Sequence, residues 1–207
     1  MSSLIRRVIE RAGQFVYSVR DAVFRRDGRT LTSAEVLAKV DQRIADAKGL
    51  MRDLTGSIAR GEISVAQWRD AMALEIRRST FQIHALGRGG WDNINADKAA
   101  IAERLKAEYG YLDKFAADIQ AGNLSQAQIQ MRADMYADHT RASYWEGAEE
   151  ANREAGRQQE RRVMGLAEHC IDCEGYASEG WQPLGYFPPP GDGSVCRANC
   201  QCSMEFR

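Results

Sequence analysis

The stretch Ile58-Ala59-Arg60-Gly61-Glu62-Ile63-Ser64-Val65-Ala66-Gln67-Trp68 contains the signals that end one helix and begin another. Gly61 is the residue type that most readily takes the left-handed conformation found just past a helix end. Ser64 and Gln67 form a capping box, because the serine hydroxyl can accept a helix amide while the glutamine side chain accepts the serine's own amide. The stretch therefore predicts a helical hairpin, which is two helices joined by a short turn.

The segments on either side of this turn have the apolar spacing of helices that pack along a neighbour. Thr32-Ser33-Ala34-Glu35 is another capping box and marks the start of the first helix. Alternating steps of four and three separate that helix's apolar residues, which are Val40, Ile44, Ala47, Met51, Leu54 and Ile58. One face of the second helix consists of Trp68, Met72, Ile76, Ser79 and Ile83. The run Gly87-Arg88-Gly89-Gly90 is interpreted as the turn that ends this helix.

The same design recurs sixty-one residues later, where Ile119-Gln120-Ala121-Gly122-Asn123-Leu124-Ser125-Gln126-Ala127-Gln128-Ile129 aligns with the first turn. The apolar seam before it aligns as well, through Ile101, Leu105, Leu112, Phe115 and Ile119. The matching face after it consists of Ile129, Ala133, Ala137, Thr140 and Tyr144. We interpret the repeat as two related antiparallel hairpins, residues 31–90 and 91–163, that pack into one helical bundle.

The last helix of the second hairpin is expected to run from about Ser125 towards Arg162. Its end, residues 149–162, has almost no apolar face. A charged helix of that kind projects into solvent, lies on a partner or frays. We therefore expect it to form an arm between the bundle and the C-terminal segment.

Residues 1–30 are expected to form a basic amphipathic helix. Apolar residues recur at helical spacing from Leu4 to Val23, and residues 1–29 contain seven arginines against three acidic residues. This helix is typical of a segment that docks on a partner protein, an acidic polymer such as DNA, or a membrane surface. A basic helix that packs on its own domain explains the pattern equally well.

The composition excludes several classes of protein. The formal net charge of the 207 residues is -1, which gives no bulk electrostatic reason to wrap nucleic acid. The apolar runs are far shorter than the roughly 20 residues that span a bilayer, so no membrane span is expected. Arg6, Arg7, Glu10 and Arg11 interrupt any secretory signal, so we expect synthesis in a reducing cytoplasm.

Residues 164–207 contain all five cysteines and all four prolines of the chain. The spacing is C-x2-C in Cys170-Ile171-Asp172-Cys173, followed by C-x3-C-x-C in Cys196-Arg197-Ala198-Asn199-Cys200-Gln201-Cys202. Clustered thiols of a cytoplasmic protein favour a tetrahedral zinc site over disulfides. Two disulfides and one free thiol are the alternative if the protein matures outside the cell.

Four of the five thiols are expected to bind a structural Zn2+ ion. Cys170, Cys173 and Cys200 supply three ligands in this prediction, and Cys196 or Cys202 supplies the fourth. His169 neighbours Cys170 in sequence and is poorly placed to bind the same ion, so we assign it to the surroundings of the site or to solvent. The predicted fold is thus mainly α, with the N-terminal helix, the two hairpins and a small irregular Cys-rich zinc knot.

No arrangement typical of an enzyme is found in the sequence. There is no His-Glu-x-x-His, Gly-x-Ser-x-Gly or paired-carboxylate pattern. His84 is interpreted as a packed or capping residue. Asp134, Asp138 and His139 are interpreted as parts of a charged helix face rather than a metal site. We therefore expect no catalytic residues.

The ending resembles that of a known family. Glu168-His169-Cys170-Ile171-Asp172-Cys173, the Gly-Pro loop through Gly193 and the final Cys196-to-Cys202 run are similar to the C-terminal signature of tailed-phage head morphogenesis, or minor head, proteins related to protein F of phage Mu. Gln201 replaces the usual arginine, and Cys196 stands near a position where many members have histidine. These departures leave the fourth zinc ligand open.

The resemblance implies a viral protein of the virion, a minor head (minor capsid) protein that aids head assembly or completion. Its implied partners are portal and major capsid protein of the bacteriophage, in several copies, with DNA contact through the N-terminal arginines as an added possibility. The implied location is the virion head, and the host cytoplasm during assembly. The alternative is a zinc-ribbon-like nucleic-acid-binding module. The acidic surroundings of the cysteines count against it, since Arg197 is the only basic residue from Cys170 to Cys202.

Overall fold

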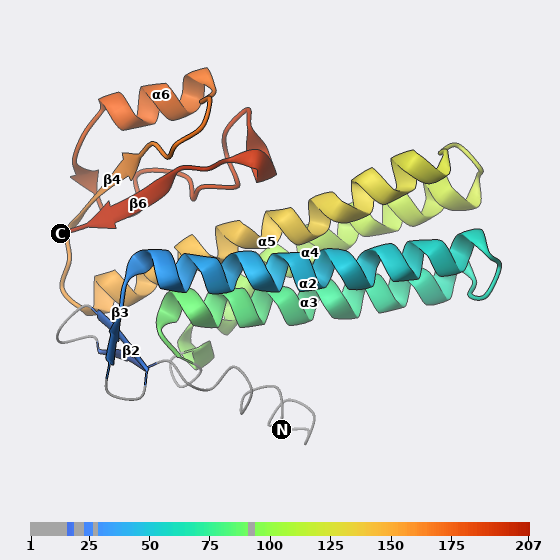
Figure 1. Cartoon of the computed structure of the whole chain (residues 1–207), viewed down its shortest axis with the longest axis horizontal. Coiled ribbons are helices and arrows are strands. Elements are labelled where there is room, and N and C mark those ends of the chain that lie inside the picture. Colours follow the sequence, from blue (N-terminus) through green and yellow to red (C-terminus); the bar gives the residue numbers. More distant parts are fainter. Residues whose placement is uncertain (1–15, 19–22, 27–28, 91–93) are drawn as a thin grey trace.

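The computed structural model describes residues 16–18, 23–26, 29–90 and 94–207, and is mainly helical (Figure 1). Four long helices form a bundle: α2 (Ser33–Ala59), α3 (Val65–Arg88), α4 (Ile94–Gln120) and α5 (Gln126–Glu154). The predicted hairpins α2–α3 and α4–α5 are confirmed, and their connecting turns lie at the same end of the bundle.

The two hairpin turns are built alike. Gly61 and Gly122 have φ angles of 71° and 72°, which is the left-handed conformation that favours glycine. The hydroxyls of Ser64 and Ser125 each accept from the amide three residues on, and the glutamines at those positions complete both capping boxes. Helices α2 and α4 are each 27 residues long, and Ile94 starts α4 sixty-one positions after Ser33 starts α2. The sequence repeat is therefore also a structural repeat.

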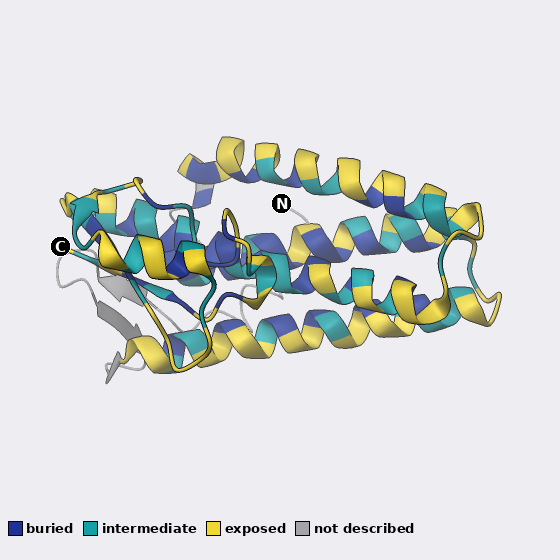
Figure 2. Cartoon of the chain, turned by 90° about the horizontal axis from the view of Figure 1, so that it is seen from above, coloured by how far each residue is buried: buried dark blue, intermediate teal, exposed yellow. Residues whose placement is uncertain are grey.

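The predicted seams face the interior of the bundle (Figure 2). Val40 and Met51 of α2, and their repeat equivalents Ile101 and Leu112 of α4, are all buried in one core cluster. Trp68 packs edge-on against Phe115, with ring centroids 5.1 Å apart. Burial of such side chains contributes about 1.5–3 kcal/mol each, so the seams carry most of the stability of the bundle.

Helices α3 and α5 touch backbone to backbone near the end of the bundle away from the turns. A Cβ atom on Gly87 would lie 2.0 Å from the backbone oxygen of Tyr144, and one on Gly147 would lie 2.4 Å from the backbone oxygen of His84. Only glycine permits this approach. Gly87 and Arg88 therefore belong to α3 rather than to the ending turn, and the helix closes at Gly89, which has a φ of 75°.

A ladder of ion pairs sets the register of α2 against α5. Lys48 Nζ lies 2.7 Å from Asp138 Oδ2, and Arg52 Nη2 lies 2.7 Å from Asp134 Oδ2. A third pair, between Asp41 and Arg141, lies closer to the start of α2. Residue numbers along α5 decrease from pair to pair as those along α2 increase, so the two helices are antiparallel. These partly exposed pairs each contribute about 0–1 kcal/mol, and they fix alignment more than stability.

The prediction of an N-terminal helix is wrong in the residues that the structure describes. Three short strands, β1 (Val16–Ser18), β2 (Val23–Arg26) and β3 (Arg29–Leu31), form an antiparallel sheet in the order β1-β2-β3. The apolar spacing suited a helix, but the β-branched and aromatic residues in this part of the chain favour strands. The rest of the predicted helix, residues 1–15, 19–22 and 27–28, lies outside the described residues.

The prediction that residues 149–162 form a charged helical arm is also wrong. Helix α5 ends at Glu154, Gly156 turns the chain with a φ of 79°, and β4 (Gln159–Val163) follows. This strand is the centre of an antiparallel sheet between β5 (Gln182–Pro183) and β6 (Ser203–Phe206). The segment showed no apolar face because its two inward positions are occupied by charged residues, as described below.

The C-terminal module thus begins at β4 rather than at residue 164. It also contains α6 (Ile171–Ser178) and the short helix η1 (Arg197–Asn199). It lies against α5, and Phe187 and Met204 join the core cluster of the bundle. The module is therefore packed on the bundle rather than attached through a projecting helix (Figure 1).

Candidate metal centre

The five cysteines come together from two parts of the module. Cys170 caps the N-terminus of α6, and Cys173 lies in its first turn. Cys196 and Cys200 flank η1, and Cys202 comes just before β6. Packing of α6 over the end of the chain places these segments side by side. The structure thus brings together the five cysteines from which the sequence prediction chose four zinc ligands.

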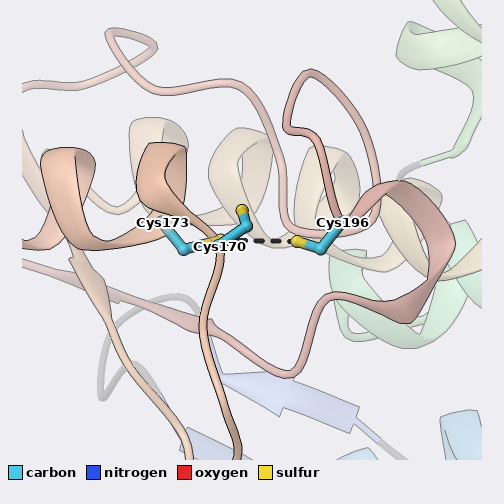
Figure 3. A group of neighbouring side chains, drawn as sticks. All are labelled: Cys170, Cys173 and Cys196. Carbon is cyan, nitrogen blue, oxygen red and sulfur yellow. Dashed lines mark hydrogen bonds between the residues drawn. The ribbon is translucent and has the colours of Figure 1, made fainter.

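The thiols form two overlapping triads that share Cys173. One triad is Cys170, Cys173 and Cys196 (Figure 3), and the other is Cys173, Cys200 and Cys202; within each, the sulfur atoms lie within 4.8 Å of one another. Cys173 Sγ lies 3.5 Å from Cys196 Sγ and 3.6 Å from Cys200 Sγ. Four sulfurs at about 2.3 Å from a tetrahedral zinc ion are about 3.8 Å apart, so these spacings fit thiolate coordination.

None of the five cysteines forms a disulfide, and all five belong to the described residues. Cys173, Cys200 and Cys202 are buried, whereas Cys170 and Cys196 are half-buried. The centre therefore has a closed interior side and a side that solvent can reach.

Hydrogen bonds hold the loop that carries Cys196 onto α6. The Val195 amide donates to Asp172 Oδ2 at 2.7 Å, and the Tyr176 hydroxyl donates to the Gly193 carbonyl at 3.0 Å. Ser194 Oγ lies 3.3 Å from Cys196 Sγ. The two hydrogen bonds to α6 position the second cysteine segment without using a thiol, and Ser194 contacts the Cys196 thiol itself.

His169 lies beside the second triad. Its Nδ1 is 3.6 Å from Cys202 Sγ, and its Nε2 is 2.9 Å from the Gly165 carbonyl oxygen. A carbonyl oxygen can only accept, so Nε2 donates and Nδ1 carries the lone pair in the neutral ring. Sequence reasoning placed His169 outside the ligand set because of its neighbour Cys170. It missed that the ring reaches the other triad.

The surroundings shift the pKa values of the thiols in opposite directions. Burial raises the pKa of Cys173 far above its usual range, and burial raises that of Cys202 to about 11. Burial also opposes ionisation of Cys170, but the backbone amides of Cys173 and Cys196 stabilise its thiolate and lower its pKa to about 7. Burial also opposes ionisation of Cys200, but hydrogen bonds, chiefly from the Cys202 amide, lower its pKa. Cys173 and Cys202 thus keep their protons unless a cation replaces them.

Two charged side chains of β4 point into the module. Glu160 and Arg162 are 0% and 2% exposed. Glu160 Oε1 accepts from the Phe187 amide at 2.8 Å, and Arg162 donates to the Pro188 carbonyl. Together they hold the loop Phe187–Pro188 against the sheet. Arg162 pairs with Met204 in β6, which makes it a diagonal neighbour of Cys202 on the same face.

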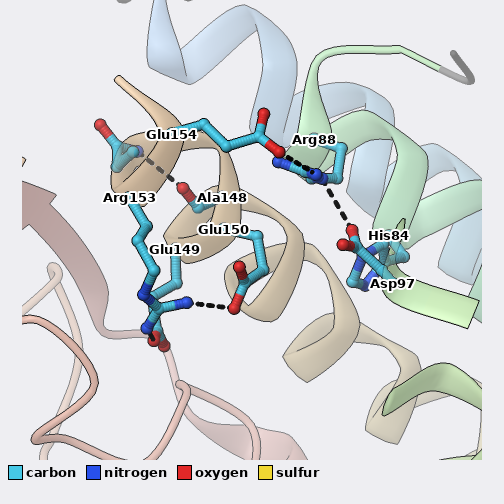
Figure 4. A network of polar contacts seen from close by, with 9 residues as sticks. His84, Arg88, Asp97, Ala148, Glu149, Glu150, Arg153 and Glu154 are labelled. Carbon is cyan, nitrogen blue, oxygen red and sulfur yellow. Dashed lines mark hydrogen bonds and ion pairs between the residues drawn. The ribbon is translucent and has the colours of Figure 1, made fainter. Parts of the chain in front are cut away.

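A second buried polar cluster joins three helices of the bundle (Figure 4). His84 Nε2 and Arg88 Nε lie 2.8 Å and 2.7 Å from Asp97 Oδ2, and Arg88 Nη2 lies 2.7 Å from Glu154 Oε1. His84 and Arg88 belong to α3, Asp97 to α4 and Glu154 to α5. The interpretation of His84 as a packed residue is confirmed, and the cluster ties the helix ends together beside the Gly87–Gly147 contact.

The charged face at Asp134, Asp138 and His139 is used within the bundle. The two aspartates pair with Arg52 and Lys48, and His139 Nδ1 lies 3.7 Å from Glu108 Oε1. These contacts agree with the sequence interpretation of an ordinary charged helix face.

No protein-family model, curated protein or solved structure matches this chain. In the described part of the chain, no helix has both the length and the apolar character needed to cross a bilayer.

Proposed function

We propose that the chain is a structural protein of a tailed-phage head, a minor head protein whose C-terminal module is held together by zinc. The observation that carries the proposal is the convergence of all five cysteines, which are the residues of the family-like ending, into triads with sulfurs within 4.8 Å. A zinc ion in such a site is structural. We propose no enzymatic activity.

The energetics of the module support a structural metal. Apart from the cysteines, the buried apolar side chains of residues 159–207 are Phe187, Pro190 and Met204, and Glu160 and Arg162 occupy the other main interior positions. Ordering the backbone costs about 1–2 kcal/mol per residue. Structural zinc contributes about 10–16 kcal/mol in small domains, which is enough to decide whether the module is ordered.

The proposed partners are portal and major capsid subunits, with the protein present in several copies in the head. Ile171 and Val195 are 77% and 73% exposed, and both lie at the edge of the metal centre. The Val195 amide donates to Asp172, which follows Ile171 in the chain, so the two exposed residues belong to segments that are joined here. An exposed apolar pair on a metal-fixed loop suits binding to another virion subunit.

Co-purification with portal and capsid protein from infected host cells, combined with metal analysis, tests this function. Ile171→Asp and Val195→Asp should lower recovery of these partners at unchanged zinc content. Leu74→Asp is the matched control, because Leu74 is 66% exposed on α3 of the bundle. Unchanged incorporation of both module variants into heads would reject this surface, and absence of the protein from purified heads would reject the function.

The second candidate, a nucleic-acid-binding module, is favoured by one observation. The guanidinium groups of Arg161 and Arg207 lie 4.9 Å and 4.3 Å from the ring centroid of Trp181. Aromatic rings with neighbouring cations are used to bind single-stranded nucleic acids. Salt-dependent binding of an oligonucleotide that is lost in Trp181→Ala would support this candidate over the structural one.

A further inference from the structure

The metal centre contains more donor atoms than one tetrahedral ion uses. Four sulfurs gather around that of Cys173, and His169 adds a ring nitrogen at 3.6 Å from Cys202 Sγ. The sulfurs do not form one compact set of five. They form two sets of three, and Cys173 is the member that both sets share.

We propose that the module binds two divalent zinc-like cations, with the Cys173 thiolate bridging them. Cys170 and Cys196 complete the protein ligands of the first cation, and Cys200, Cys202 and His169 those of the second. This inference rests on one part of the proposed function, namely that the module binds metal. It makes His169 a metal ligand, which the sequence prediction did not.

The position of His169 supports its role as a ligand. Ligand bonds of about 2.0–2.1 Å to nitrogen and 2.3 Å to sulfur place the two atoms about 3.6 Å apart on a tetrahedral ion. The 3.6 Å between His169 Nδ1 and Cys202 Sγ matches this spacing. Metal-bound histidines almost always donate their other ring N–H to a carboxylate or a carbonyl. His169 Nε2 has such a partner in the Gly165 carbonyl at 2.9 Å.

The position of Cys173 supports its role as the bridge. It is 0% exposed, and it lies 3.5 Å and 3.6 Å from one sulfur of each triad. The first triad is half-buried, so water can occupy the remaining position of its cation. The second triad is buried, and His169 Nδ1 lies beside Cys202 but not within 4.8 Å of all three sulfurs. The ring must therefore move towards Cys173 and Cys200 when the second cation binds, which closes this site as a structural one.

Charge balance favours two cations over one. A single zinc ion with four thiolates retains two negative charges next to a fifth buried thiol. Two divalent cations leave the five thiolates with one net negative charge, and the buried positive charge of Arg162, which acts electrostatically on Cys202, balances it. Arg162 Nε and Nη1 find no hydrogen-bond partner among the described residues, so they are free to face this charge.

The number of zinc ions bound per chain tests the proposal. The full-length protein is purified under reducing conditions with zinc, and the bound ions are counted by native mass spectrometry. Wild type should bind two ions. Cys170→Ser and Cys202→Ser should each bind one, and Cys173→Ser should bind none stably. His169→Ala should lose one ion or bind it at least tenfold more weakly, whereas the control His139→Ala should keep two.

X-ray absorption at the zinc edge tests the proposal on the wild-type protein, so it does not depend on whether a variant folds. Two bridged sites predict a zinc–zinc vector and an average of three sulfurs and one nitrogen or oxygen per ion. One ion per chain with four sulfurs, unchanged in His169→Ala, would overturn the two-metal proposal and leave the proposed zinc-held module standing. Complete absence of bound zinc would overturn both.

Discussion

The helical bundle and the C-terminal module reach their folds by different physical means. In the bundle, residues such as Val40, Met51 and Trp68 are fully buried at helical spacing, so apolar burial orders the chain. In the module, interior positions are taken by cysteines and by the charged residues Glu160 and Arg162. The bundle should therefore be stable without any ligand, whereas the order of the module should depend on metal.

Cys173→Ser is expected to have the largest effect, and it should disrupt the C-terminal module while leaving the helical bundle intact. Cys173→Ser removes the sulfur that both triads share, so the module should lose its metal and the roughly 10–16 kcal/mol that zinc contributes. Residues 159–207 should become sensitive to protease, while α2–α5 stay helical by circular dichroism. Loss of helical signal in parallel with zinc would show that the two regions fold as one unit.

Asp97→Ala tests the stability of the helical bundle instead. It removes the shared partner of His84 and Arg88 in a cluster that is nearly closed to water. Breaking a buried charge pair costs about 3–5 kcal/mol, which should appear as a lower denaturant midpoint. Zinc content should not change. Asp113→Ala, on the exposed part of the same helix, is the control, and an equal loss in both variants would contradict the importance of the cluster.

Gly87→Ala tests the backbone contact of α3 with α5. The added Cβ would lie 2.0 Å from the Tyr144 oxygen, so the helices must separate, at a cost of about 3 kcal/mol or more. Gly110→Ala in α4 is the matched control, because no atom lies within 4 Å of the added carbon. This control should gain about 0.5–1 kcal/mol from the better helix propensity of alanine. Two variants of equal stability would argue against the close contact.

Arg52→Ala should have the smallest effect. Its pair with Asp134 is partly exposed, with 57% of the arginine side chain open to solvent. A loss of under about 1 kcal/mol is expected, and it should fade at high salt. A larger loss measured by chemical denaturation would mean that the ladder contributes stability as well as register.

Much of the bundle could be predicted from sequence because its signals are local. Capping boxes such as Ser64 with Gln67, and glycines such as Gly61 after the helix, specify where helices begin and end. The alternating apolar seam then specifies which face is buried. The repeat at sixty-one residues carried the same signals into the second hairpin.

The parts that sequence reasoning missed depend on contacts distant in the chain. Gly87 resembles a turn residue until Gly147 is seen against it. Glu160 and Arg162 resemble solvent-facing charges, yet β4 turns both inward. Short strands in residues 16–31 have too few residues for a period to separate them from a helix. The cysteine cluster could be predicted because closely spaced thiols are themselves typical of a metal site. The contact of His169 with Cys202 could not be predicted, because the two residues are distant in the sequence.

Hydrogen exchange of the full-length protein, before and after removal of metal under reducing conditions, tests the central difference between the two regions most directly. We predict that residues 159–207 lose protection when metal is removed, while residues 33–154 keep it. Equal protection of the module with and without metal would contradict the account.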